Sequence, residues 1–287
     1  MPKVPALIEL IDSVIELKGM PRHPQEGPRR HLGASVIGRE CLREIWYSWR
    51  WAGFTRFEGR MLRLFERGHD EEPRLAELLR IVGANVQELD PATGKQFRFI
   101  GYLGHFGGGC DGIATGVPCL EPFGFSLSAR ILCEFKTHSY DRYKDVSEQA
   151  IKAGKVDHWA QTVIYMDELK TDAALYMPVC KDDDRILPEL LLPDPGAANV
   201  LRDKARRIID HKGIPPRMAH ASPSNFKCKF CDHRRACHYG APLERNCRTC
   251  KASQPVDGGR WKCNKFNALI PEDKEIEGCP QHEVIEG

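Results

Sequence analysis

The sequence predicts an α/β fold, in which a mixed central sheet is flanked by helices and followed by a small C-terminal Cys-rich metal module. Segments with helical periodicity surround segments typical of strands, in the order helix, helix, strands, helix, strand, helix. The pair Pro215-Pro216 ends this body, and seven of the twelve cysteines follow it. With 287 residues, of which 41% are hydrophobic and 29% charged, the chain can bury a core without disulfides, which excludes general disorder.

The individual elements follow from the spacing of apolar residues and from local helix and strand signals. Helices are predicted over 4–18, 34–52, 58–82, 157–169 and 196–212, and strands over 96–106, 111–117, 130–138 and 172–179. Ser35 is the expected N-cap of the second helix. Gly68 and Pro73 fall inside the third helix, where both residue types are unfavourable. Glycines 107–109 are expected to form a hairpin turn between the first two strands.

The overall charge and hydropathy exclude little about binding partners. The net charge of +2 comes from 42 basic and 40 acidic residues, so only local patches can indicate nucleic-acid binding. No apolar stretch approaches the length of a membrane span, and Glu9, Asp12 and Glu16 interrupt the apolar N-terminus. We therefore expect no membrane partner and a cytoplasmic location.

The string Glu134-Phe135-Lys136 lies inside the strand predicted over 130–138. Side chains alternate along a strand, so Glu134 and Lys136 face the same side, where burial requires partners or a task. Asp111 follows a Gly-rich turn, and a neighbouring strand could set it beside Glu134. Two close carboxylates would suit Mg²⁺ or Mn²⁺. The alternative interpretation is an exposed ion pair.

Two helices carry polar residues at helical spacing. Glu66, His69 and Glu72 are three apart and share one face, and a histidine among carboxylates can bind a metal. Gln161 and Tyr165 are four apart on the helix predicted over 157–169. The alternative for His69 is a solvated or structural histidine.

Four motifs together resemble the RecB-type branch of the PD-(D/E)XK nucleases. They are Gly68-His69, Gly109-Cys110-Asp111-Gly112, Glu134-Phe135-Lys136 and the segment from Gln161 to Tyr165. The stretch from CEFKTHSYDRYKDV through KVDHWAQTVIYM is similar to phage-encoded exonucleases of that group. The resemblance spans about residues 35–240 and implies a restriction-endonuclease-like sheet and metal-dependent DNA exonuclease activity.

The resemblance also implies roles for single residues. The metal ions would be held by His69, Asp111, Glu134 and the main-chain carbonyl of Phe135. Lys136 would position and help to deprotonate the attacking water, while Gln161 and Tyr165 would contact the substrate strand. Two bound cations lower the pKa of water and bridge phosphate oxygens, which is what phosphodiester hydrolysis requires. Cys110 stands where the family name has proline, a position that varies within the group.

Three thiols follow the predicted core with the spacing Cys228-x2-Cys231-x5-Cys237. By spacing alone, the fourth ligand of a metal site could be His233, His238 or the remote Cys41, and a zinc site with a histidine remains an alternative. The nuclease branch includes an iron–sulfur subgroup, with AddB and the nucleases that trim new CRISPR spacers. Its layout, one cysteine before the core and three after it, implies a structural [4Fe–4S] cluster on Cys41, Cys228, Cys231 and Cys237.

A second thiol set has the spacing Cys247-x2-Cys250-x12-Cys263-x15-Cys279, which is typical of a zinc ribbon. His282 could replace Cys279 as the fourth ligand. Trp261 and nearby basic residues suit a small nucleic-acid or protein docking module, and they equally suit a solvated surface. The alternative for the thiols is four unligated cysteines.

Two basic segments are candidates for DNA binding. Residues 43–67 interleave arginines, including Arg43 and Arg50, with aromatic residues that could stack on unpaired bases. The alternative is that these aromatic residues are core. Lys144, Lys152 and Lys155 form a second candidate phosphate track after the strand at 130–138.

These inferences give a domain plan and a function. The plan comprises 1–30 as an N-terminal helix and linker, 31–225 as the nuclease core, 226–240 as the iron–sulfur staple closing onto Cys41, and 241–287 as the zinc-ribbon-like module. The resemblance implies recombination or DNA end processing in a bacterial or phage-infected cell, with a single-strand annealing protein as a partner. The alternatives are a non-catalytic, metal-stapled nucleic-acid-binding adaptor and an endonuclease acting on flaps or branches.

Overall fold

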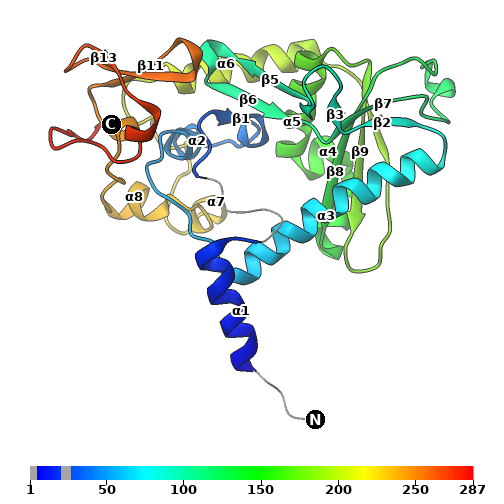
Figure 1. Cartoon of the computed structure of the whole chain (residues 1–287), viewed down its shortest axis with the longest axis horizontal. Helices are drawn as coiled ribbons and strands as arrows, with labels where there is room; N and C mark the ends of the chain where they lie inside the picture. The colour runs from blue at the N-terminus through cyan, green and yellow to red at the C-terminus, as the bar shows by residue number, and fades with distance from the viewer. Residues whose placement is uncertain (1–4, 21–26, 287) are drawn as a thin grey trace.

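A five-stranded mixed sheet forms the centre of the protein in the computed structural model, which describes residues 5–20 and 27–286 (Figure 1). Its strand order is β10-β9-β8-β7-β2, and only the pairing of β8 with β9 is parallel. The strands of this sheet are β2 Asn85–Gln87, β7 Gly112–Thr115, β8 Ile131–His138, β9 Ala173–Cys180 and β10 Glu189–Leu191. The predicted mixed α/β fold is therefore confirmed.

Three smaller sheets surround this centre. One has the order β1-β6-β5, another the order β11-β12-β13, and β3 pairs with β4 alone. Their bounds are β1 Leu32–Gly33, β3 Leu89–Asp90, β4 Lys95–Gln96, β5 Arg98–Gly101, β6 Phe106–Gly109, β11 Ser253–Val256, β12 Arg260–Cys263 and β13 Ala268–Leu269.

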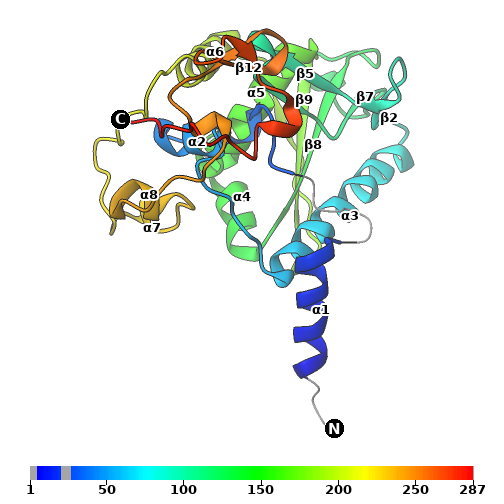
Figure 2. The same ribbon diagram turned by 60° about the vertical axis from the view of Figure 1, so that its left-hand side comes forward.

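Helices cover both faces of the central sheet. The helices are α1 Pro5–Lys18, α2 Leu42–Trp49, α3 Gly59–Ile81, α4 Tyr140–Gly154, α5 Val156–Leu169, α6 Pro195–Ile209, α7 Phe226–Lys229 and α8 Arg234–Tyr239. Figures 1 and 2 both show α1 extending away from the body, with α3 at its base. None of the helices in the described ranges is both long and apolar enough to cross a membrane.

The alternation of side chains along β8 decides which residues meet which helix. Cys133 and Phe135 pack with α3 in the smaller core cluster, while Leu132 packs with α2, α5 and α6 in the larger one. Glu134 and Lys136 share the face of Leu132 because residues two apart point the same way. The polar pair of β8 therefore points toward α5, among apolar neighbours.

The three glycines expected to form a hairpin turn lie instead in strand β6, and the turn is Tyr102–Gly104. The reason is a close approach of a helix: a Cβ atom on Gly108 would lie 2.4 Å from the Tyr165 hydroxyl. A larger residue would collide with that ring, so glycine is required by packing and not by turn geometry.

One further expectation about helices needs correction, and one helix was missed. The segment 34–52 is not one helix, because a short 3-10 turn over Ala34–Val36 is separated from α2, whose N-cap is Cys41 and not Ser35. Helix α4 was not predicted from the sequence. Helix α3 runs through Pro73, as the predicted range 58–82 requires, and its buried Leu75, Ala76 and Leu79 pack against β2 and β8.

Packing continues past Pro215-Pro216. Trp261 and Ile285, within the segment 241–287, belong to the same core cluster as residues of α2 and α5. The C-terminal segment is thus built onto the core by apolar contacts.

Candidate active site

Strand pairing brings the two expected carboxylates together. Gly112 pairs with Cys133 in the antiparallel β7–β8 ladder, so Asp111 and Glu134 occupy adjacent positions. The Asp111 carboxylate accepts a hydrogen bond of 2.7 Å from the backbone N–H of Phe135. This bond fixes the Asp111 side chain just before the start of β7.

Lys136 lies between the two carboxylates. Its Nζ forms an ion pair with Glu134, is 3.8 Å from Asp111 Oδ2, and donates a 3.0 Å hydrogen bond to the carbonyl of Phe135. Burial by itself would lower the pKa of Lys136, but Glu134 and Asp111 raise it above its usual value. The ammonium therefore stays charged at neutral pH.

Glu134 is completely buried and only partly satisfied. Its Oε1 accepts a 2.8 Å hydrogen bond from Gln161 Nε2 on α5, whereas its Oε2 is buried without a hydrogen-bond partner among the residues that the structure describes. Burial raises the pKa of Glu134 to about 8, and the Asp111 charge adds to this, while Lys136 opposes it. An unpaired carboxylate oxygen in such a place is a position that a bound cation would satisfy.

Helix α3 adds side chains from the opposite side. Glu66, His69 and Glu72 line the same cleft as Asp111. Burial, followed by the charge of Asp111, raises the pKa of Glu72 to about 7. Glu72 thus lies close enough to Asp111 to share its electrostatic environment.

The cleft in front of Asp111 has a basic and aromatic wall. The wall comes from two segments, 27–33 and 49–57, which are contributed by the loop before β1 and by the end of α2 with the loop after it. Its members include Arg29, His31, Phe54, Arg56 and Phe57, and behind them Trp51, whose side chain is buried. Cationic and aromatic groups of this kind can contact phosphates and stack on bases.

Two residues expected to contact DNA are buried, which corrects their predicted roles. Tyr165 is 3% exposed and packs against Gly108 and Phe99. Arg50 is 2% exposed, and its guanidinium lies between the rings of Trp46, Trp49 and Trp261. The tryptophans of α2 are core residues, as the alternative interpretation had it, and they enclose the arginine.

The remaining basic candidates lie outside the cleft wall. Arg43 donates to the carbonyl of Pro215 and lies 3.9 Å from Cys237 Sγ. Lys144 forms a 3.7 Å ion pair with Glu148 on exposed α4, and Lys152 Nζ is 4.9 Å from the ring of Trp159. With Lys155, which follows α4, these lysines stay a prediction for DNA contact.

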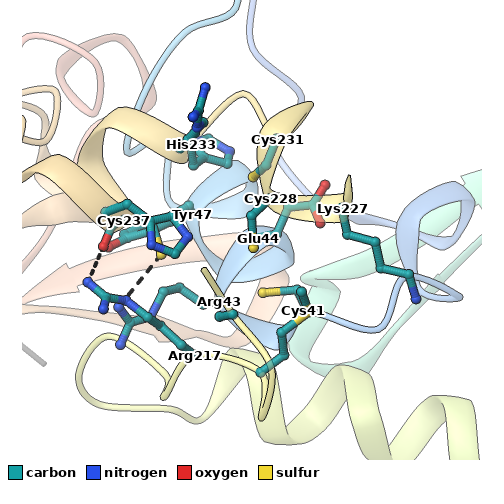
Figure 3. Close-up of a pocket in the computed structure, with 14 residues that line it drawn as sticks. Cys41, Arg43, Glu44, Tyr47, Arg217, Lys227, Cys228, Cys231, His233 and Cys237 are labelled. Atoms are coloured by element: carbon teal, nitrogen blue, oxygen red, sulfur yellow. Dashed lines mark hydrogen bonds between the residues drawn. The ribbon is translucent and has the colours of Figure 1, made fainter. Parts of the chain in front are cut away.

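The two thiol sets occupy separate places. Cys41, Cys228, Cys231 and Cys237 line one pocket, between the start of α2 and the helices α7 and α8 (Figure 3). In the second set, the backbone N–H of Cys250 donates to the carbonyl of Cys247, and Cys263 pairs with Ser253 across β11 and β12. Burial first, and then the nearby thiols of Cys279, Cys250 and Cys263, raise the pKa of Cys247 to about 11.

The side chains do not converge into a formed metal site. Within residues 5–20 and 27–286, no three His, Cys, Asp or Glu side chains are arranged so that they could hold a metal ion. At the carboxylates, Lys136 Nζ lies against Glu134, within the space between the oxygens. The donor chemistry still fits the expected groups, because carboxylate oxygens suit Mg²⁺ or Mn²⁺ and thiols suit iron or zinc.

Sequence reasoning missed part of this site. The i, i+3 spacing places Glu72 on the same helix face as His69 but does not by itself assign Glu72 a role in the cleft. Arg29 and His31 could not be found this way, since only the fold brings their loop to the cleft.

Comparison with known proteins gives similarity to solved structures only. No protein-family model matches the chain, and no curated protein sequence matches it. The structure described as SSO0001 has a TM-score of 0.45 and 18% identity, over 81% of this chain and 96% of that one. The alkaline exonuclease LHK-Exo from Laribacter hongkongensis has a TM-score of 0.40 and 14% identity, over 63% and 87% of the two chains. The structure of LHK-Exo in complex with dAMP has a TM-score of 0.41 and 14% identity, over 62% of this chain and 86% of that one.

Proposed function

We propose that this protein is a metal-dependent DNA exonuclease that hydrolyses phosphodiester bonds. The observation that carries the proposal is the placement of Lys136 against Asp111 and Glu134 at the edge of a cleft with a basic and aromatic wall. A partly buried lysine held against a fully buried glutamate costs desolvation free energy, which is unusual unless the pair has a task. Phosphoryl chemistry supplies such a task, since negative charge grows on phosphate oxygens as the bond breaks.

The residues present can share the work of hydrolysis. Asp111, Glu134, the Phe135 carbonyl and His69 would hold Mg²⁺ or Mn²⁺, with Glu134 Oε2 as the oxygen that lacks a partner. The bound ions would lower the pKa of the attacking water and neutralise the scissile phosphate. Lys136 would place its ammonium beside that phosphate, while Gln161 holds the Glu134 carboxylate in position. Glu72 would add negative charge near the ions.

We propose that the first thiol set holds a [4Fe–4S] cluster. Four cysteines around one pocket supply the full ligand number of such a cluster, and three of them come from one short segment (Figure 3). Cys41 lies far from the others in sequence, so a cluster would tie α2 to α7 and α8. Its role is then a structural staple.

For the second thiol set we propose Zn²⁺. Cys247 and Cys250 lie in one turn, Cys263 is at the end of β12, and the carbonyl of Cys279 accepts a hydrogen bond from Arg245 Nη2. His282 Nε2 lies 3.2 Å from Thr249 Oγ1, which is an existing partner for that ring, so Cys279 is the better fourth ligand. Four thiolates suit tetrahedral zinc.

The decisive experiment compares Lys136→Met with the wild-type protein on end-labelled linear duplex DNA, with Mg²⁺ or Mn²⁺ and with neither. We expect Lys136→Met to lose about 100-fold or more in cleavage rate, because a charge aimed at the transition state is removed. Lys212→Met, at an exposed position after α6, is the matched control and should cleave normally. Closed circular DNA should remain intact. Equal cleavage by Lys136→Met and wild type would exclude the proposed site, and cleavage of circles would indicate an endonuclease.

A further inference from the structure

Arg248 connects the C-terminal segment to the core through a fully buried guanidinium. The residue lies in the turn between Cys247 and Cys250 and is 0% exposed. Its Nε and Nη2 donate to Glu275 Oε2 at 3.0 and 2.7 Å. Its Nη1 donates to the carbonyls of Arg30, at 2.8 Å, and Trp49, at 3.2 Å. One side chain thus holds both segments that form the cleft wall.

Trp51 is a buried residue behind the cleft wall that contacts Arg248 directly. Its φ of 55° is in the left-handed region, which is unfavourable for a bulky residue and persists only where the surroundings enforce it. The Arg248 guanidinium lies 3.6 Å from the centre of the Trp51 ring. Asn246 Nδ2 donates to the Trp51 carbonyl at 2.8 Å, and Trp51 Nε1 donates to the Arg29 carbonyl at 3.0 Å.

The same contacts exclude a separate docking role for the buried residues of this segment. Trp261 is completely buried against Trp49 and Arg50, so its ring is not available to stack on a base. Two of the aromatic and basic residues of 241–287 that suggested nucleic-acid docking, Trp261 and Arg248, are instead buried between this segment and the core.

We propose that Arg248 is a positioning residue for DNA: the C-terminal thiol site fixes its turn, and its guanidinium holds the aromatic wall of the cleft in the shape that binds substrate. This inference rests on the proposed nuclease function and deepens it, because it assigns the C-terminal segment to substrate binding. It requires that metal binding at Cys247 and Cys250 and the position of Trp51 be coupled, since Arg248 directly follows Cys247 and only Thr249 separates it from Cys250.

The test is Arg248→Lys, which keeps the charge beside Glu275 but cannot stack on Trp51 and bond two carbonyls at once. We expect the Kd for labelled linear DNA, measured by fluorescence anisotropy with Ca²⁺ in place of Mg²⁺, to rise about 10-fold. KM should rise in parallel while kcat stays within about twofold of wild type. Acrylamide should quench tryptophan fluorescence more strongly in the variant. Arg260→Lys, exposed on β12, is the control and should match wild type in every measurement.

A second arm uses the wild-type protein and therefore does not depend on a variant folding. Removal of zinc with a chelator should weaken DNA binding and increase acrylamide quenching together, and added Zn²⁺ should restore both. Unchanged Kd in Arg248→Lys, or unchanged Kd after zinc removal, would overturn the inference. A wild-type protein that binds DNA but never cleaves it would contradict the proposed nuclease function instead, and the binding comparison would still decide the role of Arg248.

Discussion

At the scale of single residues, identical side-chain types have opposite roles depending on burial. Arg56 lines the open cleft, whereas Arg50 is enclosed by tryptophan rings and its Nη1 donates to the carbonyl of Arg248 at 3.0 Å. The sequence shows both as arginines among aromatic residues, so it cannot separate a phosphate-binding arginine from a core one. Asp111 and Glu134 were easier to interpret, because strand alternation and a neighbouring strand leave few places for them.

Glu72 provides a test at this scale. Its carboxyl group shares the environment of Asp111, so Glu72→Gln removes negative charge next to the proposed ions. We expect the Mg²⁺ concentration for half-maximal cleavage to rise about 10-fold, within the range that outer-shell groups contribute. Titration of the initial rate with Mg²⁺ measures this shift. Glu77→Gln, exposed on the same helix α3, should leave this Mg²⁺ concentration unchanged. An equal response of both variants would contradict a role for Glu72 at the site.

At the scale of elements, the sequence correctly predicted the helices and strands whose apolar residues pack in or against the central sheet. Strands β8 and β9 and helices α3, α5 and α6 lie within a few residues of the expected ranges. The failures have a common cause, which is that distant contacts decide them. Gly108 belongs to a strand because the Tyr165 ring lies above it. Helix α4 has only three buried residues, Tyr143, Val146 and Ile151, and Ala150 has a φ of 57°, so its periodicity is weak.

Helix α2 provides a test at this scale, because Cys41 is its N-cap and also lines the thiol pocket. We expect protein purified without oxygen to be brown and to contain iron and sulfide, and Cys41→Ser to lose both. The free energy of unfolding should fall by about 2–4 kcal/mol, the range for losing a covalent cross-link between distant segments. Cys119→Ser, at an exposed cysteine, is the control and should keep its iron. Colourless wild-type protein that contains only zinc would contradict the iron–sulfur proposal.

At the scale of the whole molecule, one core joins the first and last parts of the chain. Leu32, Trp49, Trp261 and Ile285 belong to the same cluster of buried residues. The sequence could not predict this joining, because the buried Arg248–Glu275 pair looks like two surface charges until the fold encloses it. Substitution of either residue by a neutral one would leave the other charge buried and unpaired, which would weaken packing of the C-terminal segment against the core.

His105 makes that docking depend on pH. Its ring is completely buried between Trp49 and Trp261, and its Nε2 lies 3.0 Å from the carbonyls of Val256 and Arg260 in the C-terminal segment. Burial lowers the pKa of His105 from 6.5 to about 4, although the two carbonyls oppose the shift. Between these values the unfolded chain binds a proton that the folded protein does not.

The stability contributed by neutral His105 is therefore fully present above pH 6.5 and is lost as the pH falls toward 4. The loss is about 1.4 kcal/mol per pH unit at most for this one group. The measurement is the free energy of unfolding, obtained by urea denaturation at pH 7 and pH 5. It should decrease less between these pH values in His105→Gln than in wild type, because glutamine can donate to the same carbonyls but does not titrate. Equal decreases in the two proteins would show that His105 is not the group that links acid to unfolding.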